Sequence, residues 1–253
     1  MDEKRYNYRI TLAYDGTCYS GWQVQPNATS IQAKVEEALK IILRKELRVI
    51  GSGRTDAGVH ALGQVAHFHC DDILDLHRLL RSLNGLLPND IRVKDIVPAS
   101  LDFHAQYSAT GKVYHYHLWL EKVHSPFLRH YSYHPYEKIN LELLREAAAL
   151  FVGTHDFTSF ANEAHAGSAC KDPVRTLSRL DILPEEGGVR LEFEADGFLY
   201  KMVRNIVGTL LEVASGKRSI EEIGSIFAAK DRKQAGKAAP PQGLFLVKVH
   251  YRE

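Results

Sequence analysis

A glycine-rich loop between two apolar segments places the strongest constraint on how this chain can fold. The loop reads Gly51-Ser52-Gly53-Arg54-Thr55-Asp56-Ala57-Gly58-Val59-His60, and a strand-like run from Ala61 to His69 follows it. Three glycines within eight residues allow backbone angles that other residues avoid, so the sequence predicts a tight, shaped turn. Polar side chains, among them Arg54 and Asp56, occupy the middle of that turn.

An arginine two residues from a carboxylate has two interpretations. A neighbouring cation favours the ionised form of Asp56, which keeps the carboxylate competent as a nucleophile or as an electrostatic partner. The alternative is an exposed turn that holds a local ion pair between Arg54 and Asp56. The chemistry of the loop alone leaves both interpretations open.

The composition bounds the class of protein and its compartment. A chain of 253 residues is long enough for one large domain or two small ones. Because 32 Lys and Arg face 31 Asp and Glu, any surface for nucleic acid must be a local patch. Cys18, Cys70 and Cys170 form no paired motif, which argues against disulfides and for a reducing compartment. The polar first residues and the lack of a long apolar run predict a cytoplasmic protein without a membrane span.

Hydrophobic periodicity predicts the same order of elements twice. In the first half we expect strands at Tyr6–Tyr14, Leu47–Ile50, Gln64–His69 and Ile91–Val97, and helices at Ser30–Glu46 and Asp75–Leu83. In the second half we expect strands at Lys112–Leu120, Val174–Leu183, Gly188–Ala195 and Gly243–His250, and helices at Asn140–Phe151, Lys201–Ser215 and Ser219–Ala229. Thr29-Ser30-Ile31-Gln32 has the form of a capping box at the start of the first helix.

Two successive β-α-β-β-α-β patterns predict an α+β fold of two tandem ferredoxin-like halves, each with helices on one face of a largely antiparallel sheet. We place the boundary near Ala105, which gives an N-terminal half of residues 1–105 and a C-terminal half of residues 106–253. Since no linker-like composition marks this boundary, we expect the halves to share one sheet.

Four segments, in order along the chain, resemble the tRNA pseudouridine synthase A family. Gly53–His60 resembles its catalytic loop, and Ala109–Tyr116 looks like its substrate-binding strand with the active-site tyrosine at Tyr114. Gly197–Gly208 is similar to the segment whose arginine, here Arg204, pairs with the catalytic aspartate, and Ala235–Leu244 resembles the closing loop before the last strand. The resemblance implies the pseudouridine synthase fold.

The resemblance also implies a reaction. The family isomerises uridine to pseudouridine in the anticodon stem-loop of tRNA, on its 3′ side (tRNA positions 38, 39 and 40). The bond between ribose C1′ and uracil N1 breaks, the base turns, and a new bond forms through C5. Nothing is oxidised and no atom is gained, so we expect no cofactor and no metal. A carboxylate suffices, attacking either C6 of the base or C1′ of the ribose, and both routes stay open.

The resemblance assigns a role to each candidate residue. Asp56 would be the nucleophile, and Arg204 would hold it ionised and oriented. Tyr114 would bind substrate by stacking on the uracil, with its hydroxyl available for proton transfer. Arg54 would occupy the place that the flipped base leaves in the RNA stack. Without the resemblance, Tyr114 reads as an ordinary strand aromatic and Arg204 as a solvated helix residue.

The family resemblance and the distribution of charged residues also predict the partners of this chain. The family works as a homodimer that binds the anticodon arm of tRNA, so we expect tRNA and a second copy as partners, and no membrane. From Lys201 onward ten cations face five carboxylates, a surplus of five that predicts a track for RNA phosphates.

The strand pairs His67/His69 and His115/His117 could in principle bind a metal, but no carboxylate or cysteine completes a ligand set.

Two alternatives remain at this level. A non-catalytic RNA-binding module could use the same fold, although such a module would not need the Asp56 carboxylate. The same chemistry could also act on a different RNA, and the sequence discriminates poorly here because backbone contacts do not reveal which uridine is read.

Overall fold

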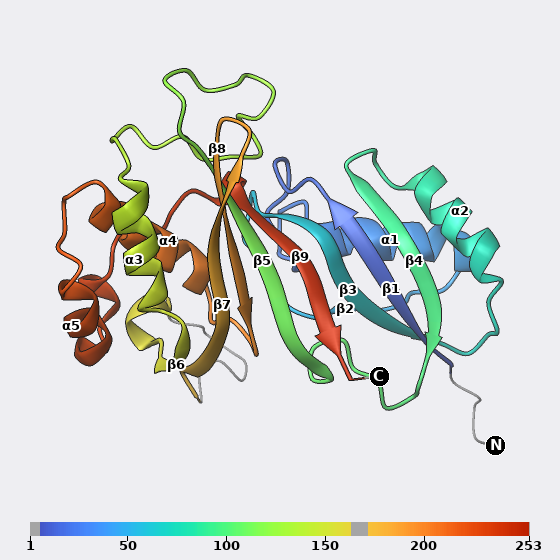
Figure 1. The fold of residues 1–253 in the computed structure, drawn as a ribbon. Coiled ribbons are helices and arrows are strands. Elements are labelled where there is room, and N and C mark those ends of the chain that lie inside the picture. Colours follow the sequence, from blue (N-terminus) through green and yellow to red (C-terminus); the bar gives the residue numbers. More distant parts are fainter. Residues whose placement is uncertain (1–5, 163–171, 253) are drawn as a thin grey trace. The chain divides into compact units, whose positions relative to one another are not determined.

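The computed structural model describes residues 6–162 and 172–252. Within those residues the chain folds into two compact units (Figure 1). The first runs to Thr110 and takes up the chain again from Phe245, and the second covers Gly111–Leu244. These units differ from the predicted division near Ala105, because the last strand pairs within the first unit. That residues 1–105 and 106–253 form two ferredoxin-like halves stays a prediction. That the two halves share one sheet also stays a prediction.

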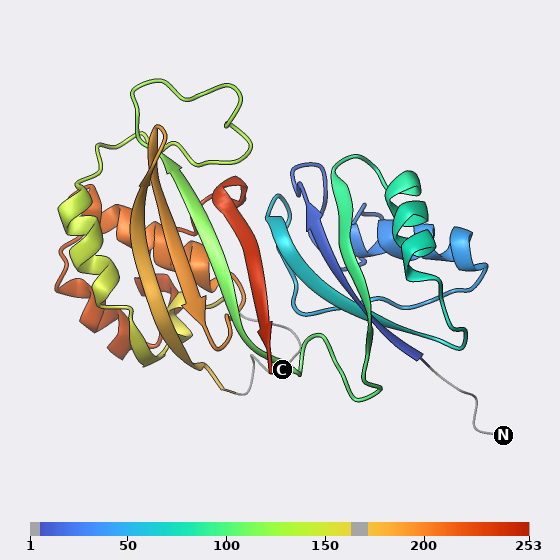
Figure 2. The same ribbon diagram turned by 45° about the vertical axis from the view of Figure 1, so that its right-hand side comes forward.

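The sheet of the first unit is mainly antiparallel and is covered by two helices. Strand β1 (Tyr6–Tyr14) pairs antiparallel with β3 (His60–Cys70) and with β4 (Ile91–Ala99), and the two-residue β2 (Ile50–Gly51) also pairs with β3. The last strand, β9 (Leu244–Tyr251), lies parallel to β3. Helices α1 (Ile31–Leu43) and α2 (Leu76–Leu86) lie on one face of these strands (Figure 2).

Helix α1 begins where the sequence predicts, but its capping differs from the prediction. The Ser30 hydroxyl accepts a hydrogen bond from the backbone N–H of Ala33 at 3.3 Å, as an N-cap does. The capping box with Gln32 is wrong. Gln32 is buried, where its amide accepts from Val24 N at 3.1 Å and donates to Val49 O at 3.1 Å. Its side chain therefore fixes the chain before and after the helix instead of the helix end.

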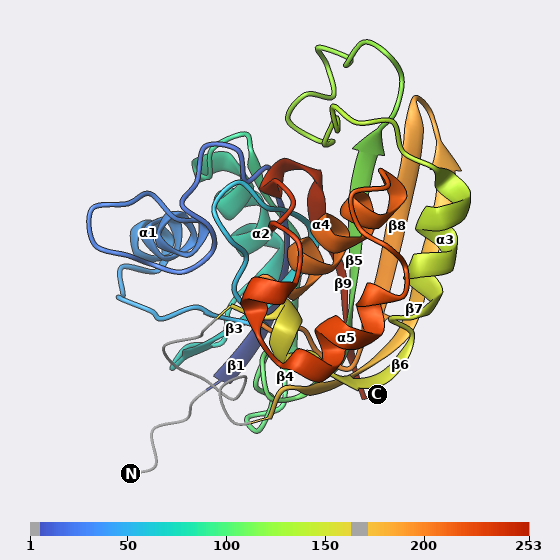
Figure 3. The same cartoon turned by 90° about the vertical axis from the view of Figure 1, so that its left-hand side faces the viewer.

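The second unit follows the predicted pattern with one strand added and without the predicted last strand, which belongs to the first unit. Strand β5 (Ala109–Trp119) pairs antiparallel with β8 (Gly188–Ala195), β8 with β7 (Val174–Glu185), and β7 with β6 (Gly153–Asp156). Helices α3 (Leu141–Ala149), α4 (Met202–Ala214) and α5 (Glu222–Ala229) lie on the same side of these strands (Figure 3). Strand β6 was not predicted because its four residues, Gly-Thr-His-Asp, show no apolar alternation. The predicted α+β class with largely antiparallel strands is confirmed.

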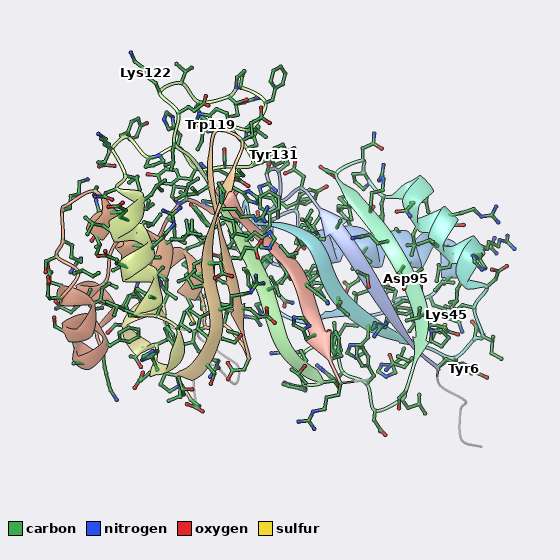
Figure 4. All side chains as sticks on the ribbon, in the orientation of Figure 1. Tyr6, Lys45, Asp95, Trp119, Lys122 and Tyr131 are labelled. Atoms are coloured by element: carbon green, nitrogen blue, oxygen red, sulfur yellow. The ribbon has the colours of Figure 1, made fainter. Side chains whose placement is uncertain are left out.

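A long connection leaves the second unit between β5 and α3 (Figure 1). It is tied at its base, where Trp119 N donates to Tyr133 O at 2.8 Å and Tyr133 N donates to His117 O at 2.9 Å. The Trp119 indole N–H donates to Val123 O at 2.7 Å. Figure 4 shows Lys122 at the outer part of this connection, with Trp119 and Tyr131 nearer its base. No described helix is long and apolar enough to cross a membrane.

His67 shows how a polar strand residue is built into the first unit. It lies on β3 with 1% of its surface exposed, and its Nδ1 accepts a hydrogen bond from Ala105 N at 3.1 Å. Burial, helped by the nearby charges of His104 and His69, lowers the pKa of His67 to about 4. The folded protein therefore holds this imidazole neutral where an unfolded chain would protonate it.

We expect His67 to contribute to acid sensitivity. An unfolded histidine titrates near 6.5, so the unfolded chain takes up a proton first as the pH falls. Stability linked to His67 is therefore present above about pH 6.5 and is lost as the pH falls to about 4, by roughly 3 kcal/mol. Urea unfolding at several pH values should show a flatter profile for His67→Gln, whereas the exposed control His77→Gln should follow the wild type. An equally steep profile for His67→Gln would contradict this.

Candidate active site

The glycine-rich loop joins β2 to β3 in the first unit, and its first residues are held by Gln64 of β3. Ser52 N donates to Val65 O at 2.7 Å, which continues the pairing of β2 with β3 by one residue. The Ser52 hydroxyl donates to Gln64 Oε1 at 2.7 Å, and Gln64 Nε2 donates to Gly53 O at 3.0 Å. Ser52 and Gln64 are both completely buried, so these bonds replace water entirely.

Thr55 is held from the other side by the first strand and the segment after it. Its hydroxyl lies 2.8 Å from the Tyr14 hydroxyl, and its carbonyl accepts from Trp22 N at 3.1 Å. The backbone approaches closely at Gly21, where φ is +88° and a Cβ would lie 2.3 Å from the Thr55 carbonyl oxygen. Only glycine fits there without moving the loop.

The second part of the loop closes as a tight turn. Val59 N donates to Asp56 O at 3.1 Å, with Gly58 at a φ of +76° inside the turn. Gly58 N donates to Tyr19 O at 3.3 Å, and a Cβ on Gly16 would lie 2.0 Å from Val59 O. The predicted tight, shaped turn is confirmed. Its close neighbours are Gly16 and Gly21, which the sequence analysis did not single out.

Arg54 and Asp56 differ from their neighbours in exposure. Ser52 and Thr55 are buried, whereas Arg54 is exposed and Asp56 is partly exposed. Across residues 6–162 and 172–252, Arg54 has no hydrogen-bond or ion-pair partner, so the alternative of a local Arg54–Asp56 ion pair is wrong. The loop is therefore anchored by the neighbours of Arg54 and Asp56, namely Ser52, Gly53 and Thr55.

Tyr114 lies on β5 in the second unit, opposite Phe193 of β8. It is buried, and its ring meets that of Phe198 edge to face with 5.0 Å between centroids. Phe198 belongs to the segment before α4 that resembles the family's arginine-bearing segment. The first two of the three resembling segments in the second unit are therefore in contact.

Arg204 lies in the first turn of α4, where it is joined to the closing loop by two hydrogen bonds. Its Nε donates to Ala239 O at 2.7 Å, and Ala239 N donates to Arg204 O at 2.9 Å. The next loop residue, Pro240, accepts from the Tyr116 hydroxyl at 2.7 Å. Burial raises the pKa of Tyr116 well above its ordinary value, while the nearby charge of Arg204 acts in the opposite direction. Helix, strand and loop thus meet at the Arg204 side chain.

A buried amide network holds the segment before the closing loop, and sequence reasoning missed it. Asn205 Nδ2 donates to Phe160 O at 2.8 Å and to Asn162 Oδ1 at 3.0 Å. Arg232 donates to Asn205 Oδ1 at 2.8 Å and to Ala235 O at 3.2 Å. Arg232 was counted among the RNA-binding cations, but its guanidinium is used inside the unit. An asparagine within an apolar helical stripe was the available signal.

Asp56 and Arg54 belong to the first unit, and Tyr114 and Arg204 to the second. Each pair is described within its own unit, and the pairing of Asp56 with Arg204 stays a prediction. In the described part of the chain, no group of three or more His, Cys, Asp or Glu residues could hold a metal ion. Two of the strand histidines lie beside carboxylates instead, His117 at 2.9 Å from Glu185 and His115 at 3.4 Å from Glu192.

Comparison with known families decides the identity of the fold. A family model described as tRNA pseudouridine synthase matches residues 10–108 and 147–252, which is most of the chain. The chain belongs to this family. The resemblance seen in the sequence is therefore confirmed, and a tRNA pseudouridine synthase is an isomerase that acts on tRNA.

Relatives at high identity cover nearly the whole chain. It is 68% identical over 245 residues to tRNA pseudouridine synthase A 1 of Protochlamydia amoebophila (strain UWE25), covering 96% of each chain. It is 49% identical over 245 residues to tRNA pseudouridine synthase A of Chlamydia muridarum (strain MoPn / Nigg), covering 96% of this chain and 91% of the relative. It is 44% identical over 245 residues to tRNA pseudouridine synthase A of Acetivibrio thermocellus, covering 97% and 99%.

We expect the close approach at Gly21 to be essential for the geometry of a tRNA pseudouridine synthase loop. Gly21→Ala places a Cβ against the Thr55 carbonyl at a positive φ, which should cost about 1–3 kcal/mol. A loop shifted by about 1 Å should lose pseudouridine formation by up to about 100-fold. The control is Gly85→Ala on α2, where nothing lies within 4 Å of the added Cβ. Wild-type activity in Gly21→Ala would mean that the loop tolerates displacement.

Proposed function

We propose that this chain converts uridines on the 3′ side of the tRNA anticodon arm to pseudouridine, with Asp56 as the nucleophile. The observation that carries the proposal is the construction of the Asp56 loop. Ser52, Gly53 and Thr55 are held by hydrogen bonds to Gln64 and Tyr14, while the Asp56 side chain stays partly exposed. A carboxylate held at a fixed place and open to a substrate is what nucleophilic attack requires.

The remaining roles follow the chemistry of the isomerisation. Asp56 attacks C6 of the base or C1′ of the ribose, and the glycosidic bond between C1′ and N1 breaks. C5 then forms the new bond to C1′, the bond to Asp56 breaks, and the C5 proton is lost to water while N1 takes one up. Arg204 stabilises the ionised carboxylate, and its hydrogen bonds with Ala239 hold the guanidinium in place. Tyr114 stacks on the uracil, and Arg54 fills the stack from which the base has been flipped. The enzyme works as a homodimer in the cytoplasm, as the family resemblance implies.

The ion pairs of the second unit separate two kinds of basic residue after Lys201. Lys217 pairs with Glu137, Lys230 with Asp156 at 2.7 Å, and Arg218 with Glu212 at 3.1 Å. These charges are already compensated by protein carboxylates. In the parts of the chain that the structure describes, the side-chain ammonium groups of Lys201, Lys233 and Lys237 have no carboxylate partner, although the backbone N–H groups of Lys233 and Lys237 donate to Asp231 and Glu212. Of the basic residues of the second unit, we therefore assign these three lysines to tRNA phosphates.

The nucleophile assignment is tested with tRNA transcripts that carry tritium at uracil C5. Purified enzyme should release tritium to water with a chelator present and no cofactor added. Asp56→Asn keeps the shape of the side chain and removes its charge, so the rate should fall by at least ~10⁴-fold. The tRNA Kd should change little, and Asp71→Asn, an exposed carboxylate elsewhere in the unit, should behave as wild type. A rate for Asp56→Asn within about tenfold of wild type corresponds to only about 1.4 kcal/mol and would exclude Asp56 as the nucleophile.

The choice of phosphate contacts is tested by two double variants with the same change in net charge. Lys233→Gln with Lys237→Gln should weaken tRNA binding and reduce the log-log salt slope by about 1.8 or less. Lys217→Gln with Lys230→Gln removes two ion-paired cations and should leave both quantities near wild type. Equal effects of the two pairs would show that net charge, not position, determines tRNA binding.

The target RNA is tested separately. Pseudouridines mapped in tRNA from cells with and without the protein should differ on the 3′ side of the anticodon arm. Loss of pseudouridine only in another RNA would favour the same chemistry on a different substrate.

A further inference from the structure

A chain of buried hydrogen bonds connects the first strand to both sides of the Asp56 loop. Its members are the Ser52 hydroxyl, the Gln64 amide, the Tyr14 hydroxyl and the Thr55 hydroxyl. Successive distances are 2.7 Å from Ser52 to Gln64, 3.5 Å from Gln64 to Tyr14 and 2.8 Å from Tyr14 to Thr55. All four residues are buried.

One fixed acceptor sets the direction of the hydrogen bonds that the Gln64 amide makes. The Gly53 carbonyl can only accept, so the Gln64 atom 3.0 Å away is the amide nitrogen, and Oε1 faces the Ser52 hydroxyl. That nitrogen has no lone pair to offer the Tyr14 hydroxyl. The Thr55 oxygen, 2.8 Å away, is the member of the network that can accept the Tyr14 proton. Burial raises the pKa of Tyr14 to about 12, so the phenol keeps this proton at neutral pH.

The placement of these bonds is selective. They reach Ser52, Gly53 and Thr55, the residues on either side of Arg54 and directly before Asp56. An apolar core at the same place could fill the volume but could not fix the backbone direction, because hydrophobic contacts are non-directional. Hydrogen bonds are directional, and a fully satisfied buried network favours a single conformation.

We propose that Tyr14 and Gln64 are positioning residues of the reaction, which hold the loop so that the Asp56 carboxylate meets the uridine in an attacking geometry. The proposal rests on the proposed role of Asp56 as nucleophile. Both side chains are buried and so closed to substrate, and their removal should lower kcat and leave tRNA binding unchanged. A displacement of about 1 Å at the carboxylate is enough for a loss near 100-fold.

The chain offers a matched control on the same strand. Tyr8 and Tyr14 both lie on β1, both are buried, and both use their hydroxyl in a hydrogen bond. The Tyr8 hydroxyl donates to Asp72 O at 3.0 Å and accepts from Leu74 N at 3.0 Å, outside the loop. Replacing either tyrosine by phenylalanine removes one buried hydroxyl, so the two variants should lose comparable stability.

The decisive experiment compares Tyr14→Phe with Tyr8→Phe. We expect single-turnover rates on saturating tRNA to fall about 10- to 100-fold in Tyr14→Phe and to stay within about twofold of wild type in Tyr8→Phe. The tRNA Kd should stay within about threefold in both. Equal rates for the two variants at matched stability would overturn the proposal, because Tyr14 would then be merely structural.

Three further variants test the network of hydrogen bonds among Ser52, Gln64, Tyr14 and Thr55. Thr55→Ser keeps the hydroxyl and should retain most of the rate, whereas Thr55→Val should lose as much as Tyr14→Phe. The combination of Tyr14→Phe with Gln64→Met should lose less than the product of the single losses, because both act through one network. A multiplicative loss, or a fully active Thr55→Val, would mean that no shared network positions the loop.

Failure of this proposal can be told apart from failure of the proposed function. If Asp56→Asn is inactive while Tyr14→Phe equals Tyr8→Phe, only the positioning role is lost. If Asp56→Asn is active, the nucleophile assignment itself falls, and a rate loss in Tyr14→Phe would then have to act through another group.

Discussion

The side-chain amide of Gln64 is the interaction on which the shape of the Asp56 loop depends. Its oxygen accepts from Ser52 and its nitrogen donates to Gly53, so one buried side chain satisfies polar groups on successive loop residues. Leaving such buried groups without partners would cost about 1–3 kcal/mol each. The same strand, β3, also carries the backbone pairing with β1 and β2. The position of the loop is therefore set by the sheet.

Most elements of the fold could be predicted because their signals are local. Tyr6–Tyr14 has the predicted bounds, and Asn140 caps α3 by accepting from Glu142 N and Leu143 N, as expected. The features that escaped prediction depend on contacts distant in sequence. Gln32 bonds to Val49, 17 residues away, and nothing near Gln32 in the sequence indicates this.

In the candidate site, too, residues with a local sequence signal could be predicted and residues that act through distant contacts could not. Asp56, Tyr114 and Arg204 could be named because short motifs surround them. Tyr14 and Gln64 could not be named, because a polar residue in an alternating strand is ordinarily assigned to the solvent face. Here both side chains face the buried residues of the loop, Ser52 and Thr55. The useful signal was Gly21, whose lack of a side chain marks the place where Thr55 approaches the backbone.

Both units use buried polar groups to hold the segments that carry the candidate residues. In the first unit Gln64 and Tyr14 hold the Asp56 loop, and in the second Asn205 and Arg232 hold the segment that leads to the closing loop. Apolar packing would be simpler and as stable, since buried polar networks contribute little net free energy after desolvation. Such networks fix the orientation of the segments they hold, because a hydrogen bond forms only within a narrow range of distances and angles. A reaction that breaks and remakes a glycosidic bond at one carboxylate depends on the orientation of that carboxylate more than on additional stability.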